Sequence, residues 1–505
     1  MKAKRNLIQI CLFCAAMLPA AVHAQFTFTT NNGTITITGY VGNPVSLVIP
    51  GTTNGYPVTS IATTAFRNRS TLVSVTIPDS VTNIGGGAFQ SCINLANATI
   101  GGGALIIGGS CFQGCPKLVN MTIPNSVTNI GSSAFDSCTS LTNMVVGSGV
   151  SSIGTGAFGN CPKLLLITVD PLNQIYSSME GVLINQVQNT LIQCPQGKVG
   201  GFTIPGGITS IMSQAFQNCG SLGSIIIADS VTSIGDGALE YCGSLTNITM
   251  PNAVTNTGNS SFAYCTNLVS ATISTNVTTI GDDLFWNCQN LRDVTIPDGV
   301  ITIGNGAFGN DLGITSVIIP DSVCSIGAYA FNACSLATLV IGNSVTNIGA
   351  WAFSGCITLS KSVTIPSSVT SIGQSGFGND WRVPAFFFQG DAPTNGPDAY
   401  WNCHSATAYY LPGTSGWTNT LGDIPAVLWN PQQQTTDGGF GVQNNQFGFN
   451  ITGTANIPLV VEACTNLTKG AWLPLLTTNL IGGAVYFIDS HWTNYTGRYY
   501  RLRSP

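Results

Sequence analysis

Charged side chains are scarce in this chain: Asp, Glu, Lys and Arg make up 7% of its 505 residues, against about 25% in an average soluble domain. The 15 basic residues are outnumbered by 20 acidic ones. The chain therefore lacks the basic field that a nucleic-acid-binding protein needs. With 44% apolar residues, it also differs from disordered chains, which combine low hydrophobicity with high charge. We expect a folded protein with no nucleic-acid partner.

Histidine is equally rare, with three residues in the whole chain. After residue 24 only His404 and His491 remain, they lie in different modules, and no Cys-x-x-Cys pair is present. A zinc site draws its ligands from clustered Cys and His, and Ser-His-Asp or Cys-His catalysis needs a histidine beside the nucleophile. We therefore expect no metal, no cofactor and no catalytic residue.

Long hydrophobic runs are absent except at the start of the chain. Lys2, Lys4 and Arg5 precede the apolar run 7–21, and the small-residue sequence Val-His-Ala ends at Ala24. This is the layout of a secretory signal peptide, and the run is shorter than the roughly 20 residues that span a bilayer. We expect a protein that is secreted or displayed at the cell surface, with no integral membrane segment in the mature chain.

A 23-residue repeat is the dominant pattern. The phrase at 80–92, SVTNIGGGAFQSC, recurs with small changes at 126–138 and 230–242. An apolar anchor, usually Phe, follows the repeated Ile by five residues, and thirteen copies keep this spacing. Between the phrases stands Leu-x-x-Val-x-Ile-Pro, whose alternation predicts a strand with one buried face that proline ends. Units of this kind bury their apolar side by stacking into a solenoid.

This L-x-x-V-T-I-P-x-S-V-T-x-I-G-x-x-A-F-x-x-C unit, over roughly Thr59 to Trp381, resembles the BspA-type (Treponema-type) leucine-rich repeat of bacterial surface proteins. The resemblance implies an extracellular protein that takes part in adhesion or protein binding. The fold class is therefore expected to be mainly β: a right-handed leucine-rich repeat solenoid of about 13 repeats, followed by a small β-sandwich.

The segments outside the repeat predict further parts. Two runs, 182–185 and 190–193, look like a β-hairpin that protrudes from the solenoid. The aromatic-rich segment 383–431 is expected to close the last coil, and about six short strand-like runs follow it. The expected organisation is a signal peptide at 1–24, an N-terminal cap at 25–58, the solenoid at 59–382 with a hairpin insertion near 170–205, a C-terminal cap at 383–431, a linker at 432–439 and a β-sandwich-like module at 440–505.

Ten cysteines follow the anchor by three residues, while Asp311 and Asp380 replace them in two copies. Secreted proteins often contain disulfides. Cysteines in one column of a stack, however, have parallel Cα–Cβ bonds, which do not suit disulfide geometry. We expect buried thiols that behave as small apolar residues.

The residues that flank Val in the strand motif are expected to point to solvent. They form a broad, nearly neutral strip suited to many weak contacts and ill suited to stabilising a transition state. We predict a non-catalytic binding or adhesion scaffold that docks an extracellular protein or glycan. A structural or ice-interacting surface and a carbohydrate-active enzyme that uses the aromatic cap are the alternatives. The candidate binding residues are Thr76, Asn120, Thr122, Asn247, Thr249, Thr272, Asp293, Thr295, Ser316 and Thr364.

Overall fold

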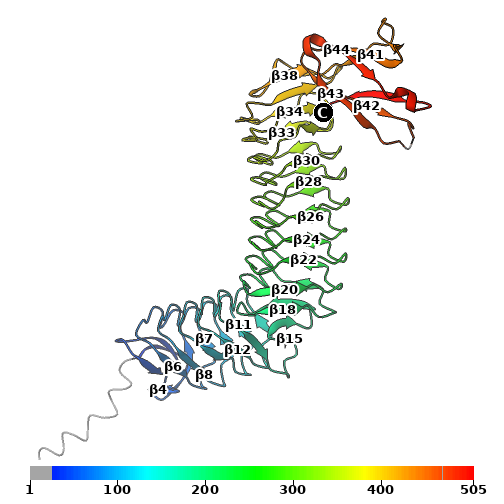
Figure 1. Cartoon of the computed structure of the whole chain (residues 1–505). Coiled ribbons are helices and arrows are strands. Elements are labelled where there is room, and N and C mark those ends of the chain that lie inside the picture. Colours follow the sequence, from blue (N-terminus) through cyan, green and yellow to red (C-terminus); the bar gives the residue numbers. More distant parts are fainter. Residues whose placement is uncertain (1–25, 469, 505) are drawn as a thin grey trace, which may run out of the picture. The chain divides into compact units, whose positions relative to one another are not determined.

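The computed structural model describes residues 26–468 and 470–504. The expected signal peptide at 1–24 lies outside the described residues. The chain forms two compact units, one ending at Ser270 and the other beginning at Ala271. Strands dominate both units, and the described residues contain two short 3-10 helices and no α-helix (Figure 1). No helix in these residues has the length and apolar character to cross a membrane.

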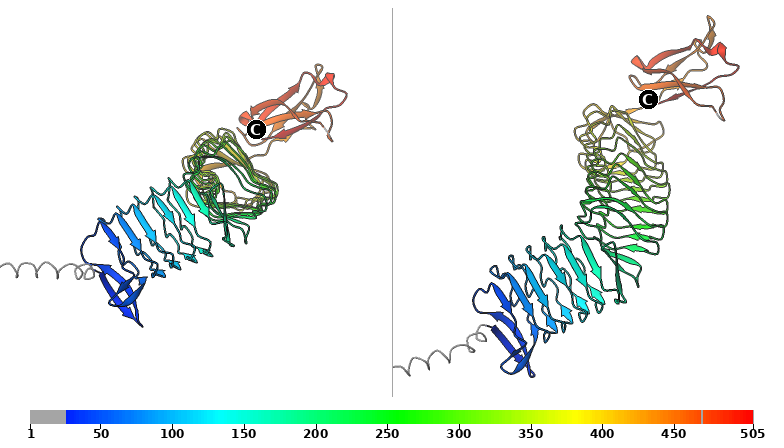
Figure 2. Two further views of the ribbon diagram at one scale, coloured as in Figure 1. Left: turned by 90° about the horizontal axis from the view of Figure 1, so that it is seen from below. Right: turned by 60° about the horizontal axis from the view of Figure 1, so that its bottom comes forward.

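Each coil repeats one path. Strand β10 (Asn120–Thr122) is followed by Pro124, and a two-residue strand, β11 (Asn129–Ile130), lies on the second side of the coil. A turn then carries the chain through Phe135 to the next coil. Equivalent strands of successive coils pair in parallel, and Figure 2 shows them side by side in the first unit. The predicted mainly-β solenoid is confirmed.

The longer strands of the first unit's coils are β3 (Ser46–Val48), β6 (Ser74–Ile77), β8 (Asn97–Ile100), β10, β12 (Asn143–Val146), β14 (Leu166–Val169), β18 (Gly200–Thr203), β20 (Leu222–Ile226) and β22 (Asn247–Thr249). The shorter strands are β7 (Asn83–Ile84), β9 (Ile106–Ile107), β11, β13 (Ser152–Ile153), β19 (Ser210–Ile211), β21 (Ser233–Ile234) and β23 (Asn256–Thr257). Strand β24 (Ser270–Thr272) includes the last residue of this unit.

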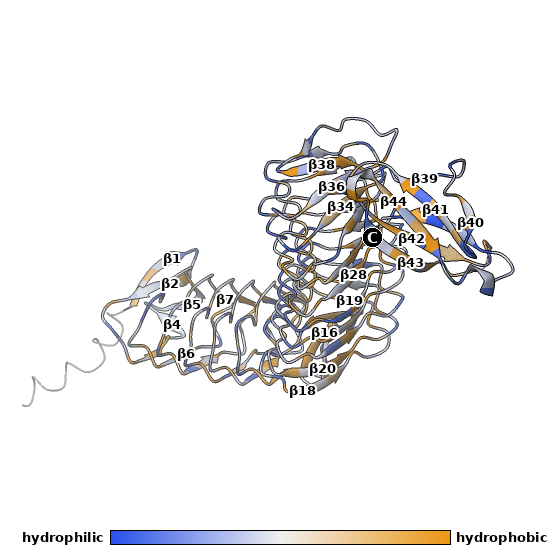
Figure 3. Ribbon diagram, turned by 45° about the horizontal axis from the view of Figure 1, so that its top comes forward, coloured by the Kyte–Doolittle hydropathy of each residue, from blue (hydrophilic) through white to orange (hydrophobic). Residues whose placement is uncertain are grey.

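Columns of Ile, Phe and Cys fill the interior. Phe135 is fully buried, and its ring stacks on Phe112 and Phe158 at centroid distances of 5.4 and 6.0 Å. Hydrophobic and hydrophilic positions alternate along the coils (Figure 3). Because one coil is apolar on one side only, stacking buries what a single coil would expose to water.

The glycine after the repeated Ile allows the coils to approach each other. A Cβ atom built on Gly131 would overlap the backbone of Gly108 and Gly109 in the preceding coil. Any larger residue would force the two backbones apart, so the spacing of the stack depends on glycine at this position.

The N-terminal segment continues the stack. Strands β1 (Phe26–Asn31) and β2 (Thr34–Tyr40) form an antiparallel hairpin, and β2 pairs in parallel with β5 (Tyr56–Ile61). The small strand β4 (Thr52–Thr53) pairs antiparallel with the first two residues of β5. Ile35 and Ile37 are fully buried, so this segment covers the end of the apolar core.

The predicted hairpin exists, and its expected protrusion is wrong. Strands β16 (Val182–Asn185) and β17 (Thr190–Gln193) pair antiparallel at the predicted bounds, and β15 (Tyr176–Met179) pairs with β16. Leu183 and Leu191 are fully buried, and β17 pairs in parallel with β19. The hairpin replaces part of a coil because its apolar side chains fill the same core.

In the second unit, the longer strands are β26 (Asp293–Thr295), β28 (Ser316–Ile318), β30 (Thr338–Val340), β32 (Val363–Ile365), β34 (Ala385–Phe388), β36 (Thr407–Tyr410) and β38 (Ile424–Leu428). The shorter strands are β25 (Thr279–Ile280), β27 (Thr302–Ile303), β29 (Ser325–Ile326), β31 (Asn347–Ile348), β33 (Ser371–Ile372), β35 (Thr394–Asn395) and β37 (Thr420–Leu421).

One coil beyond the predicted repeats belongs to this stack. Tyr400 takes the place of the anchor, stacking on Phe377 with parallel rings 6.2 Å apart, and Cys403 occupies the cysteine position. Strands β34 and β35 pair in parallel with β32 and β33. The segment expected as a C-terminal cap thus contributes coils of its own.

The chain ends in a two-sheet module. One sheet contains β39 (Gln432–Gln433), β40 (Gly441–Gln443), β41 (Gln446–Thr452) and β44 (Ala484–Asp489); the other contains β42 (Pro458–Cys464), β43 (Leu473–Asn479) and β45 (Tyr499–Arg503). The 3-10 helices are Ile481–Gly483 and Trp492–Asn494. All strand pairs are antiparallel, and buried apolar side chains such as Phe449 and Val461 lie in one core. The predicted small β-sandwich is confirmed, and its first strand lies within the segment expected as a linker.

Candidate binding face

All ten candidate binding residues are exposed on the longer strands. Five lie in the first unit, on β6, β10 and β22, and five lie in the second unit, on β24, β26, β28 and β32. Where two candidate residues share a strand of the first unit, the residue between them points into the core, as Met121 and Ile248 do. The predicted side-chain direction is therefore confirmed, and the binding role of these residues stays a prediction.

Polar side chains on this face bond to each other from coil to coil. Asn143 Nδ2 donates to Asn120 Oδ1 at 3.2 Å in the first unit. In the second unit, Thr338 Oγ1 donates to Ser316 Oγ at 2.7 Å. Side chains held in this way lose less conformational entropy when a partner docks.

Exposed aliphatic residues interrupt the threonine positions. Ile226 is 62% exposed, and Ile318 and Val340 are 67% and 52% exposed. Burial of such aliphatic groups would remove their apolar surface from water. An ice-interacting surface would instead need an unbroken threonine array, which this face does not provide.

A depression opens on this face where the sheet is interrupted between β30 and β32. Its volume is about 590 Å³, and Ile318, Val340 and Thr364 line it. Asp321 at its border accepts hydrogen bonds from the N–H and Nδ2 of Asn343, at 2.7 and 3.1 Å. In the sequence, this place is marked by one irregularity: the repeated Ile residues before and after Ile348 lie 22 and 24 residues away from it, instead of the usual 23.

The buried cysteine column does not offer a nucleophile. Cys115 Sγ donates to the carbonyl oxygen of Phe89 in the preceding coil, and Cys138 Sγ does the same to Phe112. Burial raises the pKa of Cys92 to about 11 and that of Cys115 to about 12. These thiols stay protonated at neutral pH, whereas nucleophilic attack requires the thiolate. The predicted burial of this column is confirmed.

Two carboxyl groups replace thiols in the same column. Asp311 and Asp380 are completely buried, and burial raises the pKa of both well above the usual range. Asp311 Oδ1 accepts a hydrogen bond from the Cys288 N–H at 2.7 Å, whereas neither oxygen of Asp380 makes a well-aligned hydrogen bond. They lie in the core of the second unit, so they do not form the paired acids of a glycosidase cleft.

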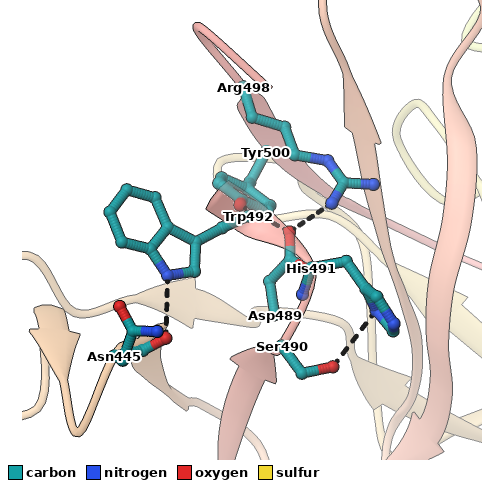
Figure 4. Close-up of polar contacts among 7 residues, drawn as sticks. All are labelled: Asn445, Asp489, Ser490, His491, Trp492, Arg498 and Tyr500. Carbon is teal, nitrogen blue, oxygen red and sulfur yellow. Dashed lines mark hydrogen bonds and ion pairs between the residues drawn. The ribbon is translucent and has the colours of Figure 1, made fainter. Parts of the chain in front are cut away.

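The C-terminal module contains adjacent Asp489, Ser490 and His491 (Figure 4). Ser490 Oγ lies 3.1 Å from His491 Nδ1. Asp489, however, bonds through its carboxylate to Arg498, to the Tyr500 hydroxyl and to the His491 backbone N–H. The aspartate therefore anchors the turn and does not orient the imidazole as a catalytic triad requires.

The aromatic residues of 383–431 mostly fill the core. Phe386, Phe387 and Phe388 are buried, and Tyr410 stacks on Trp417 with ring centroids 4.7 Å apart. Trp401 is the exception, with 52% of its surface exposed. Across 26–468 and 470–504, no group of three or more His, Cys, Asp or Glu side chains is arranged to hold a metal ion.

Comparisons with known proteins agree with this architecture. A leucine-rich repeat protein from Eubacterium ventriosum is 26% identical, covers 66% of this chain and 93% of its own, and superposes with a TM-score of 0.54. One from Bacteroides ovatus is 23% identical, covers 80% of this chain and 98% of its own, and has a TM-score of 0.53. No curated protein matches the chain.

The family model for the BspA type leucine rich repeat region matches residues 58–179, 194–315 and 302–416. These segments include the repeated Ile (Thr257 in one copy) and the anchor of every predicted repeat. The chain therefore belongs to the BspA type leucine-rich repeat family.

Proposed function

We propose that this protein is a secreted or cell-surface, non-catalytic scaffold that docks extracellular protein or glycan partners on its exposed strand face. The observation that carries the proposal is that, in each unit, successive parallel strands display exposed hydroxyl, amide and aliphatic side chains. Such a surface matches the mixed polar and apolar character of transient protein interfaces.

Secretion is part of the proposal. The basic start, the short apolar run and the small-residue end of 1–24 support it. Among the candidate residues only Asp293 is charged. A partner is therefore recognised mainly through hydrogen bonds and apolar contacts, and binding is expected to depend weakly on salt.

The test is a screen of the mature chain, residues 25–505, against arrays of glycans and secreted proteins. Any hit is then titrated against the double variant Thr295→Arg and Thr364→Arg, which places two bulky charges on the strand face. We expect this variant to bind at least tenfold more weakly, since buried unpaired charge is strongly unfavourable.

The matched control is Thr279→Arg with Asn347→Arg, which changes exposed residues on the shorter strands of the same unit. This control should bind as the unchanged protein does. The proposal fails if the arrays capture nothing, or if the control loses the partner while the strand-face variant keeps it.

A further inference from the structure

The turn before each anchor contains one residue with a left-handed backbone. In the second unit these residues have φ values between 48° and 61°. They are Asp283, Gly306, Tyr329, Trp351, Ser375 and Asp398. Small or turn-forming residues suit this conformation, because a bulky side chain crowds the backbone there. Tyr329 and Trp351 are the two bulky exceptions.

The ring stack between these two residues by itself offsets only part of this strain. Their rings are parallel within 1°, with centroids 6.1 Å apart, so they stack on each other. One aromatic stack stabilises the folded state by about as much as one bulky residue with a left-handed backbone destabilises it. Here two residues have this backbone, and they form a single stack. Backbone strain that packing does not repay is a reason to look for function.

The pair also leaves aromatic surface open. At a centroid distance of 6.1 Å the rings overlap only in part, and Tyr329 remains 43% exposed. The preceding coil has Gly306, which has no side chain, at the position equivalent to Tyr329. The Trp286 indole lies against Gly306 and Gly309, where any Cβ atom would meet it. Trp286 belongs to the coil of Phe285, so its indole covers the coil that lies between it and the coil of Tyr329.

The surroundings of the pair are polar and uncharged. Three positions lie close to the anchor in each of the four coils from Gly306 to Asn379: the residue two before the anchor and the first and second residues after it. None of these residues is charged. Asn310 and Asn332 are half-buried there, and Asn332 Nδ2 donates to the Ser354 carbonyl oxygen at 2.9 Å. Amides supply both donors and acceptors for hydroxyl groups.

We propose that Tyr329 and Trp351 form a stacking platform for a chain of neutral sugars. The C–H faces of pyranose rings pack on aromatic rings, and the nearby amides bond to the sugar hydroxyls. Rigid, amphipathic Tyr and Trp side chains suit such a site because little side-chain entropy is lost on binding. The platform lies on the turns, apart from the strand face, so its binding does not depend on the function proposed above.

The experiment is calorimetric titration of the mature chain with hexasaccharides of β-1,4-glucose, β-1,3-glucose, β-1,4-mannose and β-1,4-xylose. We expect at least one to bind. The variant Tyr329→Gly with Trp351→Ser, which installs residues that neighbouring coils use, should bind it at least tenfold more weakly. Its melting temperature should stay the same or rise, since the strain is removed.

Trp401→Ser is the matched control, because Trp401 is an exposed tryptophan of the same unit outside the pair. It should leave sugar binding unchanged, as should the strand-face variant Thr295→Arg with Thr364→Arg. The proposal is overturned if no hexasaccharide binds, if a decaproline peptide binds and the sugars do not, or if the glycine-serine variant binds normally. A clear fall in its melting temperature would also overturn it, since the pair would then serve folding.

Discussion

Replacing Asp380 by cysteine should make the second unit more stable. Asp380 stands where other coils have a thiol and is completely buried; the Cys356 N–H lies near its carboxyl group, but neither carboxyl oxygen makes a well-aligned hydrogen bond. In the next coil, Cys403 Sγ donates to the Phe377 carbonyl oxygen at 3.0 Å. Asp380→Cys would supply the equivalent small, self-satisfied group.

Two effects set the size of the gain. An unsatisfied buried polar group costs about 1–3 kcal/mol even when it is neutral. Burial also raises the pKa of Asp380 well above its usual range, which the nearby Cys356 N–H offsets only in part. The folded state therefore retains a proton that the unfolded chain releases above about pH 4. Stability falls by about 1.4 kcal/mol for each pH unit from there up to the raised pKa.

The assay is urea unfolding of the unchanged protein and the variant at pH 5 and pH 7, under reducing conditions. The advantage of Asp380→Cys should be about 1–3 kcal/mol or more at pH 5 and should grow by up to about 3 kcal/mol at pH 7. Asp380→Asn is the control: it cannot ionise, so it should lose the pH dependence while remaining less stable than the cysteine variant. An advantage that is equal at both pH values, or a less stable cysteine variant, would refute this reasoning.

Three further substitutions test the packing. Phe135→Ala should lower the free energy of unfolding by about 3–5 kcal/mol, and a loss below about 1 kcal/mol would mean that the anchor column is not core. Gly131→Ala should lower the free energy of unfolding in urea by about 1–3 kcal/mol or more, because the coils must separate to admit the methyl group. An unchanged unfolding midpoint would contradict the close approach of the coils at this glycine. Glu462→Ala should lower the stability of the C-terminal module by about 1–3 kcal/mol, because Glu462 is 4% exposed and bonds to Arg501 and Arg503. If this module melted at the same temperature in both proteins, these ion pairs would contribute nothing to its stability.

The repeat could be predicted because its signal is physical and local. An Ile, the residue directly after it (usually Gly), an anchor five residues after the Ile and a residue three after the anchor (usually Cys) each fill one fixed place in a coil. Their spacing therefore predicts strand positions, core and exposed face together. The extra coil at Tyr400 was missed because Asn395 and Tyr400 replace the usual Ile and Phe. The spacing of five and three residues to Tyr400 and Cys403 is nevertheless preserved, and was the available signal.

Other features depend on three-dimensional detail. The hairpin strands could be predicted from their sequence, whereas their burial follows from how Leu183 and Leu191 fit the core. The depression lies where the strand pairing between β30 and β32 is interrupted, and irregular repeat spacing was the only sign of it in the sequence. The meaning of Tyr329 and Trp351 emerges once the left-handed backbone at their positions is known.

Thiol labelling most directly tests whether the stacked coils enclose the cysteine column. Of the fifteen cysteines among the described residues, fourteen are buried and Cys324 is exposed. Brief treatment of the native mature protein with a thiol reagent, followed by mass spectrometry, should label Cys324 and leave the buried column unmodified until denaturant is added. Rapid labelling of Cys115, Cys138 and their equivalents in the native protein would contradict a solenoid that encloses them.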